Sequence, residues 1–388
     1  MRVCMLTYSF YESDARVQQY ANALIKRGEQ VDVIALRRDG MPKHEVIDGV
    51  SVYRIQPRTR NEQNQIAYLF RIIRFLIHAS FFISRKHLAK RYQLIHVHSV
   101  PDFMVFAAFF PKLFGARIIL DIHDILPEFY ASKFNSSSHS LLFKFLLLVE
   151  RCSVAFADYT IIANDLWYER LKRRSAKHGR CMVIRNYPDP TSFLARPKNR
   201  VNGKFLILYP GTLNWHQGVD VAIRAFARIK DQIPEAEFHI RGEGPAKPAL
   251  VSLAHQLGLD GQVVFKDFVP STEIAGVMAE ADLAVVPKRA SSPFGNEAAS
   301  TKIFEFMALG VPVIVSRTKV DTHYFDDSMV KFFDSDDAGD LANAILTLAG
   351  DRQLRDRLVA NASKYAAENN WERKKLEYLQ LVDSLVAM

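Results

Sequence analysis

The chain has 388 residues, of which 49% are hydrophobic and 24% are charged, a composition typical of globular proteins. This length exceeds what one hydrophobic core usually serves, so we expect two domains. The three cysteines, Cys4, Cys152 and Cys181, show no Cys-x-x-Cys or Cys/His spacing, which excludes a disulfide framework or a zinc site as the basis of the fold. A reducing, cytoplasmic location fits this cysteine usage best.

The net charge of +9 is concentrated in the first half of the chain. Residues 1–195 carry 28 Lys/Arg against 17 Asp/Glu, a net of +11, whereas residues 196–388 carry 23 against 25, a net of −2. A basic first half indicates an anionic partner such as a membrane surface, a phosphate or a nucleic acid.

The chain begins with a predicted strand, Val3–Thr7, and no secretory leader is recognisable before it, so we do not expect secretion. The longest apolar run, Tyr68–Ile83, is interrupted by Arg71 and Arg74. The sequence therefore predicts that this run is too short and too charged to cross a bilayer.

Short apolar runs alternate with helix-period segments along the whole chain, which predicts parallel sheets covered on both faces. The alternation stops between Asn186 and Gly203, so we predict an α/β fold of two doubly wound domains, residues 1–190 and 191–367. Ligands bind beyond the carboxyl ends of such strands, and a cleft between the domains is the expected site. The predicted strands are Val3–Thr7, Val31–Leu36, Val50–Ile55, Leu94–His98, Arg117–Ile122, Tyr159–Ala163, Met182–Arg185, Phe205–Tyr209, Glu237–Arg241, Val263–Phe265, Leu283–Val286 and Val313–Val315.

Residues 296–316, NEAASTKIFEFMALGVPVIVS, place Glu297 in a predicted loop and Glu305 on a helix over Lys302–Ala308. Ser300 or Thr301 can cap this helix, and Gly310 can end it. Two carboxylates on one wall of a cleft can accept hydrogen bonds from the vicinal hydroxyls of a ribose or sugar. The alternative is a pair of solvated glutamates at the surface.

Glu297 and Glu305, followed by Phe-Met-Ala-Leu-Gly-Val-Pro-Val-Ile, resemble the signature of family-4 glycosyltransferases, close to a cell-surface polysaccharide subgroup. These are retaining enzymes with the GT-B architecture, in which two Rossmann-like domains face each other across a cleft. The resemblance implies that Glu305 binds the ribose of a donor nucleotide and that Glu297 contacts the donor sugar. It also implies that a terminal helix, residues 368–388, returns to the first domain.

Residues 209–220 read as a strand, a turn with Gly211 and a helix start, where backbone N–H groups can receive a phosphate. The segment is similar to the family's Gly-Arg-Leu…Lys-Gly motif, whose Arg and Lys neutralise the donor diphosphate. Thr212 stands at the Arg position and Gln217 at the Lys position. The departure leaves the diphosphate short of its usual cations and favours the alternative of weak or lost activity.

Lys302 is our preferred replacement cation because it lies inside the donor motif, ahead of Lys288 and Arg289. Ser300 and Thr301 are donor-binding candidates at the start of the same helix.

Gly242 and Gly244 follow a strand and resemble the family's Gly-x-Gly loop near the nucleotide, although a tight turn requires the same glycines. Phe268 lies in a segment that resembles the nucleobase-contacting one.

His123 follows a strand and lies among carboxylates, a setting for a proton carrier, a metal ligand or a hydrogen-bonded structural histidine. The resemblance implies that His123 faces the donor sugar as a catalytic residue, with Asp124 and Glu128 as neighbours. His96 and His98 alternate on the preceding strand, and without a third ligand nearby we interpret them as structural or cleft-lining rather than metal-binding.

Arg16 follows the first strand, in Asp14-x-Arg16-Val17, where many family members carry a Gly-Gly loop that this chain lacks. Arg16 and Asp124 are our candidates for contacts with the acceptor or a phosphate. A surface arginine is the alternative for Arg16.

Residues 54–91 carry a single acid, Glu62, and interleave apolar and aromatic residues with nine Lys/Arg: Arg54, Arg58, Arg60, Arg71, Arg74, Arg85, Lys86, Lys90 and Arg91. Such a segment can lie on an anionic bilayer, and a core helix with a basic solvent face is the alternative. No recognised binding module accompanies the charge, so we do not expect nucleic acid as a partner.

The resemblance implies a retaining enzyme that takes its sugar from a nucleotide-diphosphate donor, without a protein-bound metal or other cofactor. The implied acceptor is a glycan or lipid-linked intermediate at the cytoplasmic face of the membrane, which the enzyme contacts peripherally. Two alternatives stay open: a non-catalytic nucleotide-sugar-binding relative or partner subunit, and a GT-B sugar-nucleotide epimerase.

Overall fold

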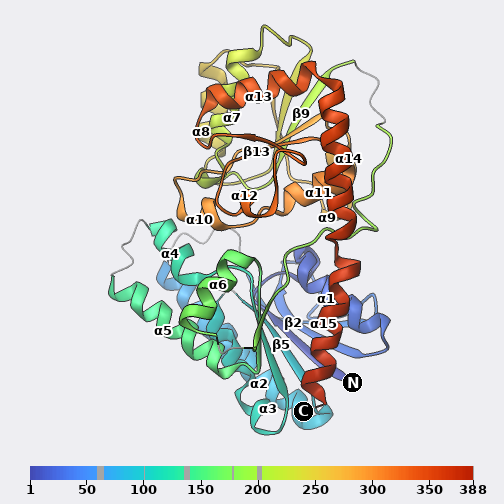
Figure 1. Cartoon of the computed structure of the whole chain (residues 1–388). Helices are drawn as coiled ribbons and strands as arrows, with labels where there is room; N and C mark the ends of the chain where they lie inside the picture. The colour runs from blue at the N-terminus through green and yellow to red at the C-terminus, as the bar shows by residue number, and fades with distance from the viewer. Residues whose placement is uncertain (59–64, 100, 135–139, 177–178, 199–202, 388) are drawn as a thin grey trace. The chain divides into compact units, whose positions relative to one another are not determined.

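The computed structural model describes every residue except 59–64, 100, 135–139, 177–178, 199–202 and 388 (Figure 1). The chain divides into two compact units, Met1–Asn186 with Lys374–Met388, and Tyr187–Arg373. Residues 199–202 of the expected linker, and Arg60 and Glu62 of the basic segment, lie outside the described residues.

Within the described residues, the first unit holds an eight-stranded sheet in the order β3-β4-β2-β1-β5-β6-β7-β8. Its neighbouring strands run parallel except β3, which pairs antiparallel with β4. Strand β3 was not predicted, because its four residues are mostly exposed and polar and carry no apolar run. The bounds are β1 (Arg2–Thr7), β2 (Gln30–Arg37), β3 (His44–Ile47), β4 (Val50–Pro57), β5 (Leu94–Ser99), β6 (Arg117–Ile122), β7 (Tyr159–Ile162) and β8 (Cys181–Val183).

The helices of the first unit begin at recognisable caps. The Asp14 side chain accepts a hydrogen bond from the Val17 amide at the start of α1, and Ser140 accepts one from Phe143 at the start of α5. The helices are α1 (Ala15–Lys26), α2 (Gln65–Lys90), α3 (Phe109–Leu113), α4 (Leu126–Phe134), α5 (Leu141–Phe156), α6 (Asp165–Arg174) and most of α15 (Trp371–Val386), with short 3-10 turns η1 (Tyr11–Ser13) and η2 (Asp102–Ala108).

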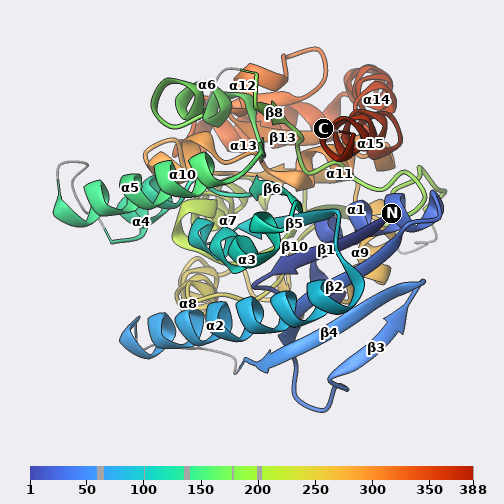
Figure 2. The same ribbon diagram turned by 90° about the horizontal axis from the view of Figure 1, so that it is seen from below.

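Helix α2 corrects one sequence prediction. From Ala67 to Lys90 it is long and apolar enough to cross a membrane by length and composition, because the helix continues well beyond the apolar run that the sequence marked out. One side of α2, with Ile72, Phe75, Ala79 and Ile83 at helical spacing, is nevertheless buried in the first unit. Only 22% of its most apolar window is buried, so apolar side chains of α2 stay exposed. Helix α2 runs beside the outer strands of the sheet (Figure 2).

The second unit holds, within the residues described, a parallel six-stranded sheet in the order β11-β10-β9-β12-β13-β14. Side chains alternate along the central strand: Ile207 and Tyr209 pack with α7, α8 and α13, whereas Leu208 packs with α9, α11 and α14. Both faces of this sheet are therefore covered. Strand β14 was not predicted, because it is only three residues long.

The strands of the second unit are β9 (Phe205–Pro210), β10 (Ala236–Arg241), β11 (Val263–Lys266), β12 (Leu283–Val286), β13 (Val313–Ser316) and β14 (Lys331–Phe333). Its helices are η3 (Trp215–Gln217), α7 (Val219–Ile229), α8 (Lys247–Gln256), α9 (Ser271–Ala279), α10 (Pro293–Glu297), α11 (Thr301–Leu309), α12 (Asp321–Tyr324), α13 (Ala338–Gly350) and α14 (Arg352–Glu368).

Each sheet has a point where the strand order reverses, between β1 and β5 in the first unit and between β9 and β12 in the second. The carboxyl ends of strands beside such a point are where open α/β sheets bind ligands. Arg16 follows β1 in the first unit, and in the second unit Gly211 follows β9 and Glu297 follows β12. His123 follows the neighbouring strand β6.

Candidate functional site

The two predicted glutamates lie on consecutive helices of the second unit. Glu297 is the last residue of α10 rather than part of a loop, because Ser292 accepts a hydrogen bond from the Gly295 amide and caps this short helix. Its carboxylate lies 3.5 Å from the Lys319 ammonium. The second glutamate, Glu305, lies on the side of α11 opposite the buried core residues, as predicted.

Lys302 is a partly buried cation of the second unit. Among the residues that the structure describes, no carboxylate lies within ion-pair distance of its ammonium, which lies 5.8 Å from the centre of the Tyr209 ring. Burial lowers the pKa of Lys302, Glu305 opposes that shift and Lys288 adds to it. Burial likewise raises the pKa of Glu305, against the effects of Lys302 and of a hydrogen bond from Thr301. Lys302 and Glu305 lie one turn apart on α11, so cation and carboxylate share one edge of the helix.

Gly211 is what allows Lys302 to lie over the end of β9. A Cβ atom at this position would lie 2.2 Å from Cε and 2.9 Å from Nζ of Lys302, and the backbone has a φ of +140°. Any side chain here would both strain the backbone and displace the lysine.

The other two candidate cations are already neutralised. The Lys288 ammonium is buried, lies 2.8 Å from the Asp321 carboxylate and donates to the Ala298 carbonyl at 2.7 Å. Arg289 pairs with Asp220 and Asp336. Of the three cations that the sequence offered for a diphosphate, Lys302 is the one whose charge the described residues leave unpaired.

Ser300 occupies the N-cap position of α11 without using its side chain as a cap. Its hydroxyl is buried and has no hydrogen-bond partner among the described residues. Buried polar groups are nearly always hydrogen-bonded, so an unsatisfied hydroxyl at a helix N-terminus points to a polar ligand, and this end of a helix attracts anions.

The loops after β9 and β10 run against each other. The Gly211 amide donates to the Arg241 carbonyl at 2.8 Å and the Leu213 amide to the Glu243 carbonyl at 2.9 Å. A Cβ at Gly242 would lie 1.9 Å from the Gly211 carbonyl oxygen, and one at Gly244 would lie 2.4 Å from that of Leu213. Close packing between two loops thus accounts for both glycines, and their contact with a nucleotide stays a prediction.

Thr212 and Gln217, at the missing Arg/Lys positions, both contact the neutral Tyr209 hydroxyl. The Tyr209 hydroxyl donates to the Thr212 carbonyl at 2.9 Å and to the Gln217 side-chain oxygen at 3.3 Å. Thr212 and Phe268 are exposed, which leaves both accessible to a ligand.

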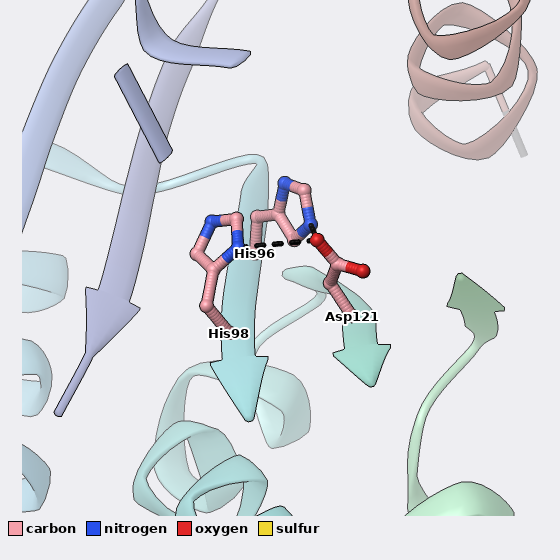
Figure 3. A group of neighbouring side chains, drawn as sticks. All are labelled: His96, His98 and Asp121. Atoms are coloured by element: carbon pink, nitrogen blue, oxygen red, sulfur yellow. Dashed lines mark ion pairs between the residues drawn. The ribbon is translucent and has the colours of Figure 1, made fainter. Parts of the chain in front are cut away.

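In the first unit, His96, His98 and Asp121 form a buried group at the centre of the sheet (Figure 3). The two histidines alternate on β5, and strand register places Asp121 of β6 opposite His98. One Asp121 oxygen lies 3.3 Å from a ring nitrogen of His98 and 3.9 Å from one of His96. A third ligand is therefore present beside the two histidines, contrary to the sequence analysis, because strand pairing cannot be read from the spacing of residues along the chain.

Arg16 forms an ion pair with the Asp121 carboxylate. Its Nε and a terminal nitrogen donate to the two Asp121 oxygens at 2.7 and 2.6 Å, and its other terminal nitrogen donates to Asn186 at 2.8 Å. Burial raises the pKa of Asp121, but Arg16 and His123 outweigh it and hold that pKa well below the usual value. The positive charge that balances Asp121 is thus a guanidinium, which disfavours a metal ion on the same oxygens. The acceptor or phosphate role of Arg16 stays a prediction, and these contacts give it a structural one.

His123 lies at the partly exposed edge of this group, with Nε2 at 3.2 Å from Asp121. Deeper in, burial and the neighbouring His98 lower the pKa of His96 well below the usual value, and burial lowers that of His98. The two inner histidines are therefore neutral, while His123 has both a carboxylate partner and a partly accessible ring.

The remaining carboxylates differ in their partners. Burial raises the pKa of Asp124, against the effect of His123, whereas Glu128 pairs with Arg170 and Arg174 rather than with the histidine group. The sequence analysis assigned no role to Asp121 and none to Tyr378, whose hydroxyl lies 3.1 Å from Nδ1 of His96. Asp121 could have been found from the sequence, because it is the one charged residue in the otherwise apolar stretch Ile118–Ile122. No sequence pattern marks Tyr378.

Comparison with known proteins defines the class first. The sucrose-phosphate synthase of Thermosynechococcus elongatus is similar over 100% of this chain and 99% of its own, with a TM-score of 0.81 and 20% identity. The structure of Anabaena HepE in complex with UDP and glucose is similar over 99% of this chain and 100% of its own, with a TM-score of 0.73 and 19% identity. The fold is that of the GT-B proteins.

Sequence comparison then gives the family. Residues 13–187 match the glycosyl transferase 4-like domain, and residues 192–365 match glycosyl transferases group 1. An uncharacterized glycosyltransferase of Methanocaldococcus jannaschii is 26% identical over 314 residues, 76% of this chain and 74% of its own. The putative colanic acid biosynthesis glycosyltransferase WcaL of Escherichia coli K12 is 29% identical over 157 residues, 40% of this chain and 39% of its own. The chain belongs to the family-4 glycosyltransferases of GT-B fold, as its double-glutamate motif indicated.

Proposed function

We propose that this glycosyltransferase moves a sugar from a nucleotide-diphosphate donor to an acceptor hydroxyl with retention of the anomeric configuration. The observation that carries the proposal is the partly buried ammonium of Lys302. It has no ion-pair partner within the described residues, and it lies over Gly211. The unsatisfied hydroxyl of Ser300 begins the same helix, and Glu305 lies one turn further along.

The proposed chemistry follows from these charges. The bond between the anomeric carbon and the diphosphate oxygen breaks, and its electron pair stays on the leaving phosphate oxygen. The acceptor hydroxyl oxygen forms the new bond to the anomeric carbon on the same face, and its proton passes to the leaving phosphate. Lys302 and the N-terminus of α11 stabilise the charge that develops there, which is the interaction that accelerates a reaction most. Glu305 accepts hydrogen bonds from the ribose, and Glu297 contacts the sugar.

His123 is the proposed first-unit residue that faces the sugar, and Asp121 is its positioning residue. The carboxylate holds Nε2 of the ring at 3.2 Å, and Arg16 keeps that carboxylate charged. An Asp121→Asn variant is expected to weaken this orientation and lower the transfer rate without loss of nucleotide-sugar binding.

The proposed acceptor is a glycan or a lipid-linked intermediate at the inner face of the membrane. The name of the E. coli relative refers to colanic acid biosynthesis, in keeping with such an acceptor. The exposed apolar face of α2, within the basic residues 54–91, is the proposed membrane contact.

A screen of UDP-, GDP- and dTDP-sugars by thermal shift tests the donor, and release of the nucleoside diphosphate with the best binder tests turnover. We expect one donor to stabilise the protein, and NMR of the product to show a retained anomeric configuration. Binding without release favours the non-catalytic alternative, in keeping with Thr212 and Gln217, and conversion of the donor into an isomer without an acceptor favours an epimerase. Stabilisation by none of these donors contradicts the proposal.

A further inference from the structure

The first unit contains a cavity of about 580 Å³ that no part of the proposed transfer reaction uses. It lies between the outer strands of the sheet and helix α2: Arg37, Tyr53 and Ile55 line it from β2 and β4, and Ile77, Phe81 and Phe82 from α2. Its volume falls in the range of ligand pockets, and all its lining residues belong to one unit.

One wall of the cavity is a fixed aromatic stack. The His44 ring stacks on Tyr53 with 4.3 Å between ring centres, and Tyr53 packs on Phe82 at 5.1 Å. Lys86 donates to the Tyr53 hydroxyl at 2.8 Å and lies 4.0 Å from the centre of the same ring. These contacts hold the wall in place before any ligand binds, which lowers the entropy lost on binding.

Three cations line the cavity, Arg37, Lys43 and Arg54, and they differ in their pairing. Arg54 is neutralised by Glu12 and Glu45. For Arg37 and Lys43, the described residues offer no side-chain ion pair or hydrogen bond, so their charges are available to an anion. Beside these cations and two histidines, the lining is aromatic and aliphatic, with Tyr53, Ile55, Ile77, Phe81 and Phe82, which suits a ligand with an anionic head and a hydrocarbon tail.

The apolar side of the cavity continues onto an exposed ridge of α2. Phe70, Ile73, Ile77, Phe81 and Leu88 recur at helical spacing, and each is between 40% and 71% exposed. Large exposed apolar side chains in a row mark an interaction surface. Arg74 and Arg85 are exposed on the same helix and supply basic charge beside the ridge.

We infer that this cavity binds the headgroup of one anionic phospholipid while the α2 ridge enters the surface of the bilayer. The inference rests on the membrane location proposed above and adds to it a stoichiometric lipid site. Arg37 and Lys43 contact the phosphate, and Ile55, Ile77 and Phe81 cover the start of the acyl chains. A basic, aromatic-lined helix face is the arrangement that anionic lipid surfaces attract.

Titration calorimetry with short-chain phosphatidylglycerol below its critical micelle concentration tests the pocket. We expect saturable one-to-one binding, about tenfold or more weaker in Arg37→Ala/Lys43→Ala, since hydrogen bonds to charged groups are strong. Arg357→Ala, which removes an exposed cation from the second unit, is the matched control and is expected to bind like the parent. Phosphatidylcholine of the same chain length and inorganic phosphate are expected to bind more weakly, because each lacks either the net charge or the tail.

Co-sedimentation with vesicles of phosphatidylglycerol and phosphatidylcholine tests the ridge. Ile77→Ser/Phe81→Ser is expected to lose most vesicle binding, and Leu376→Ser, which alters an exposed leucine of α15, is expected to keep it. The proposed lipid site is wrong if the parent and the Arg37/Lys43 variant bind the short-chain lipid with equal affinity. It is also wrong if the parent binds vesicles but does not bind the short-chain lipid. Nucleotide-sugar binding, measured on the same variants by thermal shift, reports on the transferase proposal separately.

Discussion

Each unit holds a cation beside the end of a central strand, Arg16 buried and Lys302 partly buried, and the two cations differ in their pairing. In the first unit, Arg16 is 7% exposed and donates to both oxygens of Asp121 and to Asn186. In the second, Lys302 has no ion-pair partner within the residues that the structure describes, and burial lowers its pKa. A buried charge without a partner costs stability, so a protein that keeps one has another use for it.

The comparison shows why Arg/Lys counts do not locate a phosphate site. The first unit is the more basic one, yet its buried Arg16 is paired with a carboxylate, as are Lys288 and Arg289 in the second unit. Pairing, rather than the number of charges, distinguishes a structural cation from one available to a ligand. Four predictions test this distinction, in order of decreasing effect.

The largest effect is expected when the paired cation is removed. Arg16→Met leaves the Asp121 carboxylate buried and unpaired, which is expected to lower the free energy of unfolding by about 3–5 kcal/mol. Urea denaturation measures this loss, and Lys26→Met on the same helix is the control with little expected change. Adding Asp121→Asn to Arg16→Met removes the unpaired charge and is expected to restore part of the stability. If the double variant is no more stable than Arg16→Met, the unpaired Asp121 carboxylate is not the cause of the lost stability.

Removal of the unpaired cation is expected to affect turnover and not folding. Lys302→Met is expected to reduce kcat/KM for transfer by about 10²–10³-fold, the effect of losing one group that stabilises developing charge. Its stability is expected to equal or exceed that of the parent, because an unpaired and partly buried charge is lost. Lys364→Met, an exposed lysine on α14, serves as the control, and a Lys302→Met variant with parental kcat/KM contradicts the diphosphate role.

Glu305 tests the ribose assignment. Glu305→Ala is expected to weaken nucleotide-sugar binding about 10–100-fold, the range for losing a hydrogen bond to a charged group. Titration calorimetry measures the affinity, with Glu273→Ala on the exposed face of α9 as a control. Unchanged affinity in Glu305→Ala removes the carboxylate from the donor site.

The smallest effect concerns the pH dependence of stability. Because the pKa of Lys302 is lower in the folded protein than in the unfolded chain, the unfolded state binds more protons between the folded pKa and the unfolded value. The contribution of Lys302 to the free energy of unfolding therefore rises with pH through that window. Urea denaturation at several pH values from 7 to 10 is expected to show the parent gaining stability relative to Lys302→Met; a constant difference means that Lys302 titrates normally.

Much of the fold could be predicted from the sequence, because local patterns of residues are enough to indicate its strands and helix ends. Each predicted strand is present, and Gly310 ends its helix as expected, since alternation and capping depend on neighbours along the chain. What escaped prediction is short or exposed, such as β3, or depends on length, as with α2, whose helix extends past its most apolar run.

The sequence by itself determined the order of the elements, the two α/β units and, through the double-glutamate motif, the glycosyltransferase family. Only the tertiary structure decided which charges are paired. Strand register joins Asp121 to His98, packing of α1 brings Arg16 onto the same carboxylate, and Gly211 leaves room for Lys302 above β9. Electrostatic pairing depends on distances of a few ångströms between residues far apart in the chain, and no pattern of neighbouring residues encodes those distances.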